Sequence, residues 1–209
     1  MNFYNMTPEL ILASASPRRR EILDRMGIPF RVHPADVEER NGSERGPEEM
    51  VLWNARLKTE AVAAIFPDRV VLGADTSVFL DGRVFNKPGT REEASFMLGQ
   101  LSGNTHTVVT GLWLVWKNRQ REWHGAVRSE VVFRRYDWET VKTYLDAVNP
   151  LDKAGAYGIQ ERGDLLVASY RGSYTNIMGL PAEETASALE AFGVPVPPRG
   201  DPDRERDRR

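Results

Sequence analysis

The densest run of apolar positions lies between Val70 and Leu80, and a single carboxylate, Asp75, interrupts it. Aliphatic and β-branched side chains in such a run are typical of a strand that is covered on both faces. The Asp81-Gly82 pair that follows is a strong tight-turn signal, so a hairpin is predicted here. A lone ionised carboxylate is costly inside such a strand, and it therefore needs cations, a metal or several hydrogen-bond donors close by.

Helical and strand patterns cover most of the remaining chain. Ser16 and Thr90 are suited to helix N-caps, and Val-, Thr- and Trp-rich segments joined by a polar connection predict a second hairpin. The expected helices span about 17–26, 47–66, 91–101, 137–147 and 181–192. The expected strands span 10–13, 30–33, 70–80, 83–85, 105–116, 123–134 and 165–170, with a turn-rich connector at 172–180.

The composition is that of one ordinary globular domain, with 209 residues, 41% of them hydrophobic and 28% charged. A formal net charge of -2 provides no global positive field, so neither nucleic acid nor an anionic membrane is expected as the main partner. The absence of cysteine excludes disulfides and a cysteine nucleophile, and with no signal-peptide or membrane-spanning pattern we expect a cytoplasmic protein. We expect one domain over 1–193 and a disordered Pro-rich, charged tail over 194–209.

The turn at 14–20 combines two serines with three consecutive arginines at a predicted helix start. Free N–H groups and the positive dipole end of a helix attract phosphate, and Arg18 can add bidentate hydrogen bonds. Ser14 and Ser16 would add hydroxyl groups to such a phosphate cradle. The alternative is that Ser16 only caps the helix while the arginines lie in solvent.

Other charged candidates for partners of Asp75 occur in three places. Lys58 interrupts an apolar line of its helix, so it either points toward a site or extends over the core with its ammonium in water. Lys87 precedes a proline at a strand end, where lysines are usually exposed but where sites are also built. Glu38 and Glu39 supply the hard oxygen ligands that Mg²⁺ or Mn²⁺ prefers beside phosphates, although acidic loops are usually only solvated.

Gln160 closes a glycine-rich loop and offers a donor and an acceptor at one planar end. Uracil and thymine present an acceptor, a donor and an acceptor along their pairing edge, so a glutamine can engage the ring N–H and one carbonyl together. Cytosine and guanine present other patterns, which such a site would reject. An exposed loop glutamine is an equally good interpretation of this residue alone. The three histidines share no ligand spacing, and the P-loop and dinucleotide patterns are absent.

Several short blocks of sequence follow one another in unbroken order between about residues 10 and 192. They are LASASPRR at 12–19, GADT at 73–76, KP at 87–88, LSG at 101–103, DKAGAYGIQ at 152–160, GSY at 172–174 and GLP at 179–181. Together they closely resemble the Maf family of nucleoside triphosphate pyrophosphatases. The GADT and DKAGAYGIQ blocks resemble the branch that acts on dTTP and UTP, whereas the 7-methyl-GTP branch differs in these loops.

The resemblance implies an ITPase-like α/β fold of the Maf/HAM1 type, with a long mixed β-sheet flanked by helices and two lobes with a cleft between them. It implies hydrolysis of dTTP or UTP to the monophosphate and pyrophosphate by water attack at the α-phosphorus, assisted by a divalent metal, Mg²⁺ or Mn²⁺. Modified pyrimidine nucleotides are further candidate substrates in a house-cleaning role, and a homodimer is expected. The alternatives are a non-catalytic nucleotide-binding regulator of cell division and a Maf enzyme of 7-methyl-GTP specificity.

The resemblance also implies roles for individual residues. Asp75 would be the proton acceptor, a metal ligand or both, with Lys58 and Lys87 as further catalytic residues. The substrate-binding and specificity residues would be Ser14, Ser16, Arg18, Thr76 and Gln160. Glu39 would be the second metal ligand, with Glu38 as the open alternative.

Overall fold

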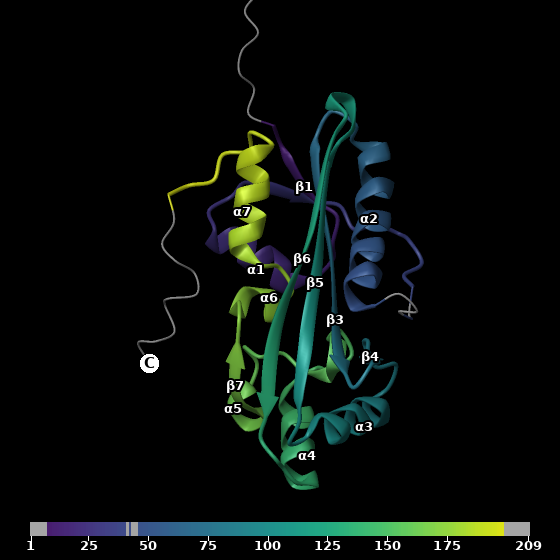
Figure 1. Ribbon diagram of the computed structural model, residues 1–209, viewed down its shortest axis with the longest axis vertical. Coiled ribbons are helices and arrows are strands. Elements are labelled where there is room, and N and C mark those ends of the chain that lie inside the picture. Colours follow the sequence, from purple (N-terminus) through teal and green to yellow (C-terminus); the bar gives the residue numbers. More distant parts are fainter. Residues whose placement is uncertain (1–7, 41, 43–45, 199–209) are drawn as a thin grey trace, which may run out of the picture.

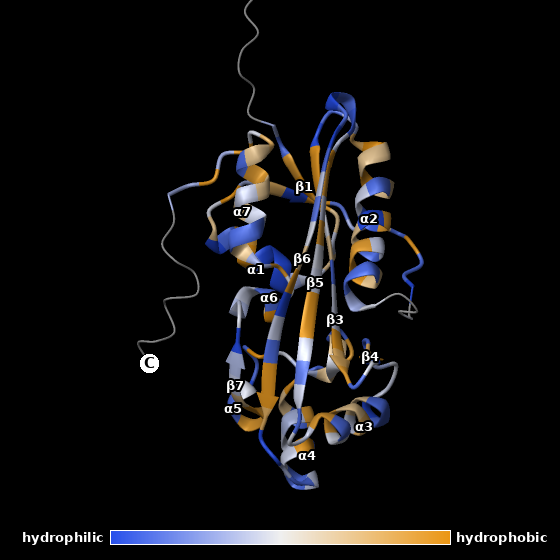
Figure 2. Ribbon diagram, viewed as in Figure 1, coloured by the Kyte–Doolittle hydropathy of each residue, from blue (hydrophilic) through white to orange (hydrophobic). Residues whose placement is uncertain are grey.

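Three long antiparallel strands form the axis of the molecule in this computed structural model, which describes residues 8–40, 42 and 46–198 (Figure 1). They are β3 (Val70–Leu80), β5 (Thr105–Trp116) and β6 (Arg121–Phe133). The turn between β5 and β6 contains the short 3₁₀ helix η1 (Lys117–Arg119), and this hairpin tip is hydrophilic (Figure 2). Within the sheet Asp75 of β3 lies opposite Gly111 of β5.

Shorter strands extend this frame on both sides. They are β1 (Leu10–Leu12), β2 (Phe30–Val32), β4 (Arg83–Phe85) and β7 (Val167–Arg171). Among the described residues the sheet has seven strands in the order β2-β1-β3-β5-β6-β7, and β4 pairs with β3. The pairs β1–β2 and β1–β3 are parallel and the others antiparallel. The prediction of a long mixed sheet is confirmed.

Helices cover the sheet differently at its two ends (Figure 1). The α-helices are α1 (Pro17–Arg25), α2 (Pro47–Ile65), α3 (Arg91–Leu101), α4 (Trp138–Ala147), α5 (Gly163–Leu166), α6 (Tyr174–Met178) and α7 (Ala182–Ala191). At one end α2 lies on one face of the sheet, and α1 and α7 lie on the opposite side. At the other end α3 and α4 pack together beside the 3₁₀ helix η2 (Ala154–Ala156). The long strands therefore run through both predicted lobes.

Two glycines let α2 approach the sheet closely. A Cβ atom at Gly73 would lie 2.1 Å from Thr59 Oγ1, and one at Gly111 would lie 2.7 Å from the backbone of Val51. The Thr59 hydroxyl donates across this contact to the carbonyl oxygen of Trp113 on β5. Because the helix sits this close to the strands, its inward side chains reach the middle of β3.

Several local predictions can be compared with the structure. Thr90 caps α3 by accepting a hydrogen bond from Glu93 N, which confirms its assignment. Ser16 occupies the N-cap position of α1, but its side chain makes no capping bond, so that part of the prediction is wrong. Instead, its N–H donates to Ser14 Oγ at 3.2 Å.

The strand predicted at 165–170 and the connector at 172–180 also need correction. The strand begins only at Val167, because the preceding residues form α5 and bury Leu166 in the core. The connector contains the helix α6, which Ser173 caps by accepting from Asn176 N. Short helices lack the repeated periodicity that sequence patterns detect.

The start of the predicted C-terminal tail contacts the domain. Val194 is buried, and Val196 packs against the main core. Residues 199–209 lie outside the described residues, so the disorder expected there and the division at 193 stay predictions. No helix of the described chain is long and apolar enough to cross a membrane.

Candidate active site

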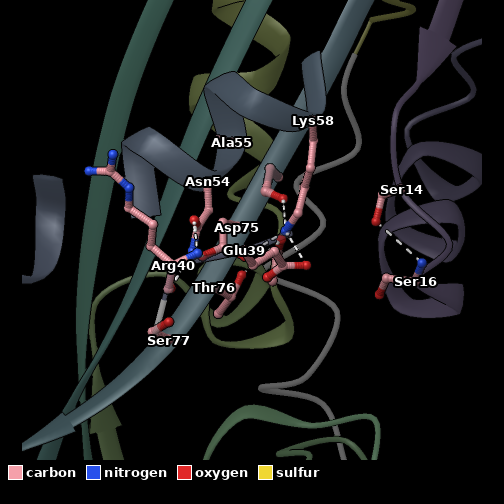
Figure 3. A network of polar contacts seen from close by, with 12 residues as sticks. Ser14, Ser16, Glu39, Arg40, Asn54, Ala55, Lys58, Asp75, Thr76 and Ser77 are labelled. Atoms are coloured by element: carbon pink, nitrogen blue, oxygen red, sulfur yellow. Dashed lines mark hydrogen bonds and ion pairs between the residues drawn. The ribbon is translucent and has the colours of Figure 1, made fainter. Parts of the chain in front are cut away.

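Asp75 is the buried centre of a polar cluster in the middle of β3 (Figure 3). Lys58 Nζ lies 2.7 Å from its Oδ1 atom, and Asn54 Nδ2 donates to its Oδ2 atom at 3.1 Å. Both partners project from the same face of α2, because residues four apart on a helix lie one above the other. The carboxylate thus has the cation and the donor that the sequence analysis required. Of the two interpretations of Lys58, the inward one is confirmed, since this side chain is buried.

Lys58 also joins the acidic loop to Asp75. Its ammonium lies 3.0 Å from Glu39 Oε1, so two carboxylates share one cation. Burial raises the pKa of Asp75 and the charge of Glu39 adds to this effect, which together outweigh the opposite effect of Lys58. Although burial acts to raise it, Lys58 and Lys87 hold the pKa of Glu39 below its ordinary value. Two neighbouring carboxylates therefore have opposite tendencies to hold a proton.

Asn54 is a site residue that the sequence analysis missed. Besides its bond to Asp75, it accepts from Arg40 N at 2.9 Å and donates to Arg40 O at 3.1 Å. The Arg40 guanidinium also stacks over the ring of Trp53, 3.8 Å from its centre. These contacts attach the loop that carries Glu39 to α2. The available signal was the four-residue spacing from Asn54 to Lys58 on one helix.

A second arginine of this turn, Arg19, is a site residue that the sequence analysis did not single out. Arg19 is buried, and its guanidinium donates to Ser14 Oγ at 2.9 Å, to Gly179 O at 2.9 Å and to Thr76 Oγ1 at 3.2 Å. It is therefore Arg19 that contacts Thr76, next in the chain to Asp75. Helical spacing carried this signal, because Arg19 shares its side of α1 with the buried Ile22.

Arg18, the arginine chosen from sequence, lies at the pocket wall and is paired with the opposite lobe. Its guanidinium donates to Asp152 Oδ2 at 2.8 Å and to Asp152 O at 2.9 Å. Only 15% of its side chain is exposed. Arg18 thus connects the start of α1 with the loop that leads to Gln160.

A pocket of about 600 Å³ opens between the two lobes at this cluster. All the predicted site residues line it: Ser14, Ser16, Arg18, Glu38, Glu39, Lys58, Asp75, Thr76, Lys87 and Gln160. Lys87 is exposed at the pocket, and partial loss of solvent around it is the main cause that lowers its pKa. Glu38 is exposed, whereas Glu39 contacts Lys58, so the geometry favours Glu39. The pocket combines carboxylates and carboxamides with six cationic residues, as a binding site for a polyanion with a polar head requires. The cationic residues are Arg18, Arg19, Arg40, Lys58, Lys87 and Lys153.

The possible metal ligands in the pocket also limit which cations can bind. No group of three or more His, Cys, Asp or Glu side chains in the described part of the chain is placed to hold a metal ion. Asp75 and Glu39 nevertheless meet at one ammonium, and Mg²⁺ is commonly held by one or two carboxylates together with substrate phosphates and water. These residues fit a divalent cation that arrives with a phosphorylated ligand.

Known proteins are similar to this chain over most of its length. A dTTP/UTP pyrophosphatase from Moorella thermoacetica is 46% identical over 188 residues, which cover 90% of this chain and 97% of that protein. One from Syntrophus aciditrophicus is 43% identical over 188 residues, covering 90% and 92%. A solved HAM1 protein from Coxiella burnetii has a TM-score of 0.52 at 16% identity, covers 88% of this chain and 99% of that chain, and confirms the predicted fold. The model of the family described as Maf-like protein matches residues 9–192, and the chain therefore belongs to the Maf family.

Proposed function

We propose that this protein hydrolyses dTTP and UTP to the monophosphate and pyrophosphate, with Asp75 as the proton acceptor. The observation that carries the proposal is the buried Asp75 carboxylate, held by Lys58 and Asn54 at the wall of a cationic pocket. The names of the similar proteins, which are dTTP/UTP pyrophosphatases, support the choice of substrate.

In this proposal each charged group has a separate task. Asp75, held by Lys58 and Asn54, orients the attacking water and accepts its proton. Lys58 keeps this carboxylate in place at 2.7 Å. Arg19 and Lys87 reduce the negative charge that builds up on the phosphate oxygens during the reaction. Arg18, Thr76 and Gln160 contribute to substrate choice.

A divalent cation, Mg²⁺ or Mn²⁺, completes the proposed site. Asp75 and Glu39 would hold it together with oxygens of the triphosphate. Such a cation polarises phosphoryl oxygens and stabilises charge on the leaving group. Without it, the two carboxylates would repel the substrate, so metal dependence is part of the proposal.

One assay tests the substrate and the metal together. Pyrophosphate release is measured with dTTP, UTP, CTP, modified pyrimidine triphosphates, GTP and 7-methyl-GTP, each with Mg²⁺, with Mn²⁺ and without metal. We expect activity on UTP and dTTP that needs metal. Activity on guanine nucleotides alone would refute the choice of branch, and binding without hydrolysis of any nucleotide would favour a regulator.

Replacing Asp75 tests the assigned base. Asp75→Asn keeps the shape of the side chain and should lower kcat for UTP by roughly 10²- to 10⁴-fold, the usual contribution of a general base. Circular dichroism of the variant checks its folding. Near-normal turnover would contradict the assignment. The homodimer and the cytoplasmic location expected from sequence stay predictions.

A further inference from the structure

The Gln160 carboxamide lies in the pocket wall, and a neighbouring carboxylate accepts a hydrogen bond from one of its ends. Its Nε2 group donates to Glu161 Oε1 at 3.2 Å. Its Oε1 atom is buried and has no hydrogen-bond partner among the described residues. A buried acceptor without a partner is costly, and a ligand that brings a donor removes this cost. Gln160 is among the residues that line the pocket, so a ligand bound there is a possible source of the missing donor.

The orientation depends on the chemistry of Glu161. The two ends of a carboxamide have nearly the same shape, so packing alone does not decide which end faces the pocket. An ionised carboxylate only accepts hydrogen bonds, so it holds the NH₂ end of Gln160 toward itself. The carbonyl end is left without a donor from the described residues. Gln160 lines the pocket and Glu161 does not, which places Glu161 behind the residue that it orients.

A buried lysine holds Glu161 in turn. Lys153 Nζ lies 3.1 Å from Glu161 Oε2, 2.8 Å from Asp152 Oδ1 and 2.8 Å from Asn149 O. With 3% of its side chain exposed, this lysine is a rigid anchor. It occupies one oxygen of Glu161, and the other oxygen faces Gln160.

The packing around this cluster leaves little room for another arrangement. A Cβ atom at Gly158 would lie 3.0 Å from Lys153 Cε, 3.1 Å from Glu161 Oε1 and 3.4 Å from Gln160 Oε1. The three polar side chains thus converge on the space that the glycine leaves open.

We propose that Glu161, anchored by Lys153, is a positioning residue that selects uracil and thymine against cytosine by fixing the orientation of Gln160. The free Gln160 oxygen matches the ring N3–H of uracil and thymine. Cytosine has an unprotonated N3 at the same position, so two acceptors would face each other. This inference rests on the proposed pyrophosphatase function, and it adds a residue that acts through another without touching the substrate.

The test compares UTP and CTP in steady-state kinetics of the full chain. Glu161→Gln has the same shape but can donate as well as accept. The Gln160 carboxamide can therefore rotate so that its oxygen and nitrogen exchange places. We expect the ratio of kcat/KM for UTP to that for CTP to fall about tenfold, the effect of one matched hydrogen bond. An unchanged ratio with lower activity on both substrates would mean a merely structural role and would overturn the inference.

Two controls make the result specific. Glu130→Gln removes the carboxylate of an exposed pair with Arg171 on β6 and β7, and it should leave the ratio unchanged. In a Gln160→Leu background Glu161→Gln should no longer alter the ratio, because a positioning residue has nothing left to position. A further change of the ratio in that background would overturn the inference.

The same experiment separates the inference from the proposed function. Wild-type hydrolysis of UTP with a ratio that does not respond to Glu161→Gln refutes the role of Glu161 alone. Absence of wild-type hydrolysis of both UTP and CTP refutes the proposed function and the inference with it. Thermal unfolding of each variant verifies that it is folded at the assay temperature.

Discussion

The ion pair between Lys58 and Asp75 allows a quantitative prediction about stability. In Lys58→Met the methylene part of the side chain is replaced by one of similar length, but the ammonium is lost. Asp75, 5% exposed, then keeps its bond from Asn54, and Glu39 loses its contact with Lys58 as well. Breaking a buried ion pair by removing one partner costs about 3–5 kcal/mol, because an uncompensated charge remains.

This cost is measurable by thermal or urea unfolding at pH 7. For a chain of this size 1 kcal/mol corresponds to about 2–4 °C in Tm, so we expect Tm to fall by about 6–20 °C. The loss of stability caused by Lys58→Met should be smaller at acidic pH. Protonation removes the unpaired charge of Asp75, and its pKa already lies above the ordinary value in the wild type.

Two variants serve as controls for this reasoning. Lys142→Met removes an exposed lysine of α4 and should change the free energy of unfolding by less than about 0.5 kcal/mol. Asp75→Asn should cost less than Lys58→Met, because Lys58 keeps its contact with Glu39. If Lys58→Met lowers the free energy of unfolding no more than Lys142→Met does, the ion pair makes no measurable contribution to stability and the prediction is refuted.

Three further predictions concern the frame around the site. Gly73→Ala should destabilise the fold by about 1–3 kcal/mol in urea unfolding, because its Cβ would meet Thr59. Gly99→Ala, in α3 with open space, should instead stabilise it by about 0.8 kcal/mol, and equal effects would contradict the packing argument. Burial lowers the pKa of His106 from 6.5 to about 4, so the unfolded chain takes up the proton first as the pH falls. The free energy of unfolding should therefore drop between pH 6.5 and 4 by about 3 kcal/mol in total, and His106→Gln should lack this component. The same pH dependence in both proteins would exclude the histidine as its source. Asn54→Ala should lower kcat for UTP more than it changes KM, since Asn54 orients Asp75; an effect on KM alone would contradict this.

The sequence by itself determined the long elements and the centre of the site, whereas it missed the short helices α5 and α6. A strand with one carboxylate, the turn at Asp81 and Gly82, and the cap at Thr90 are local features, because neighbouring residues decide them. Both turn residues do adopt positive φ, 49° and 76°. The family resemblance identified ten of the residues that line the pocket, although it gave no geometry.

Only the tertiary structure decided which members of that set touch. Arg19 rather than Arg18 contacts Thr76, because the side of α1 that packs inward carries Arg19. Glu39 rather than Glu38 reaches Lys58 because Asn54 attaches the acidic loop to α2.

The orientation of Gln160 likewise depends on contacts that no local pattern contains. Its neighbour Glu161 is held by a lysine eight residues earlier, and the same loop is joined to Arg18 across 134 positions of the chain. The local pattern of apolar and polar residues indicates which side chains face inward. Which of them meet is set by the packing of α1, α2 and the loop before α5 against one long strand, and this brings distant residues together around Asp75.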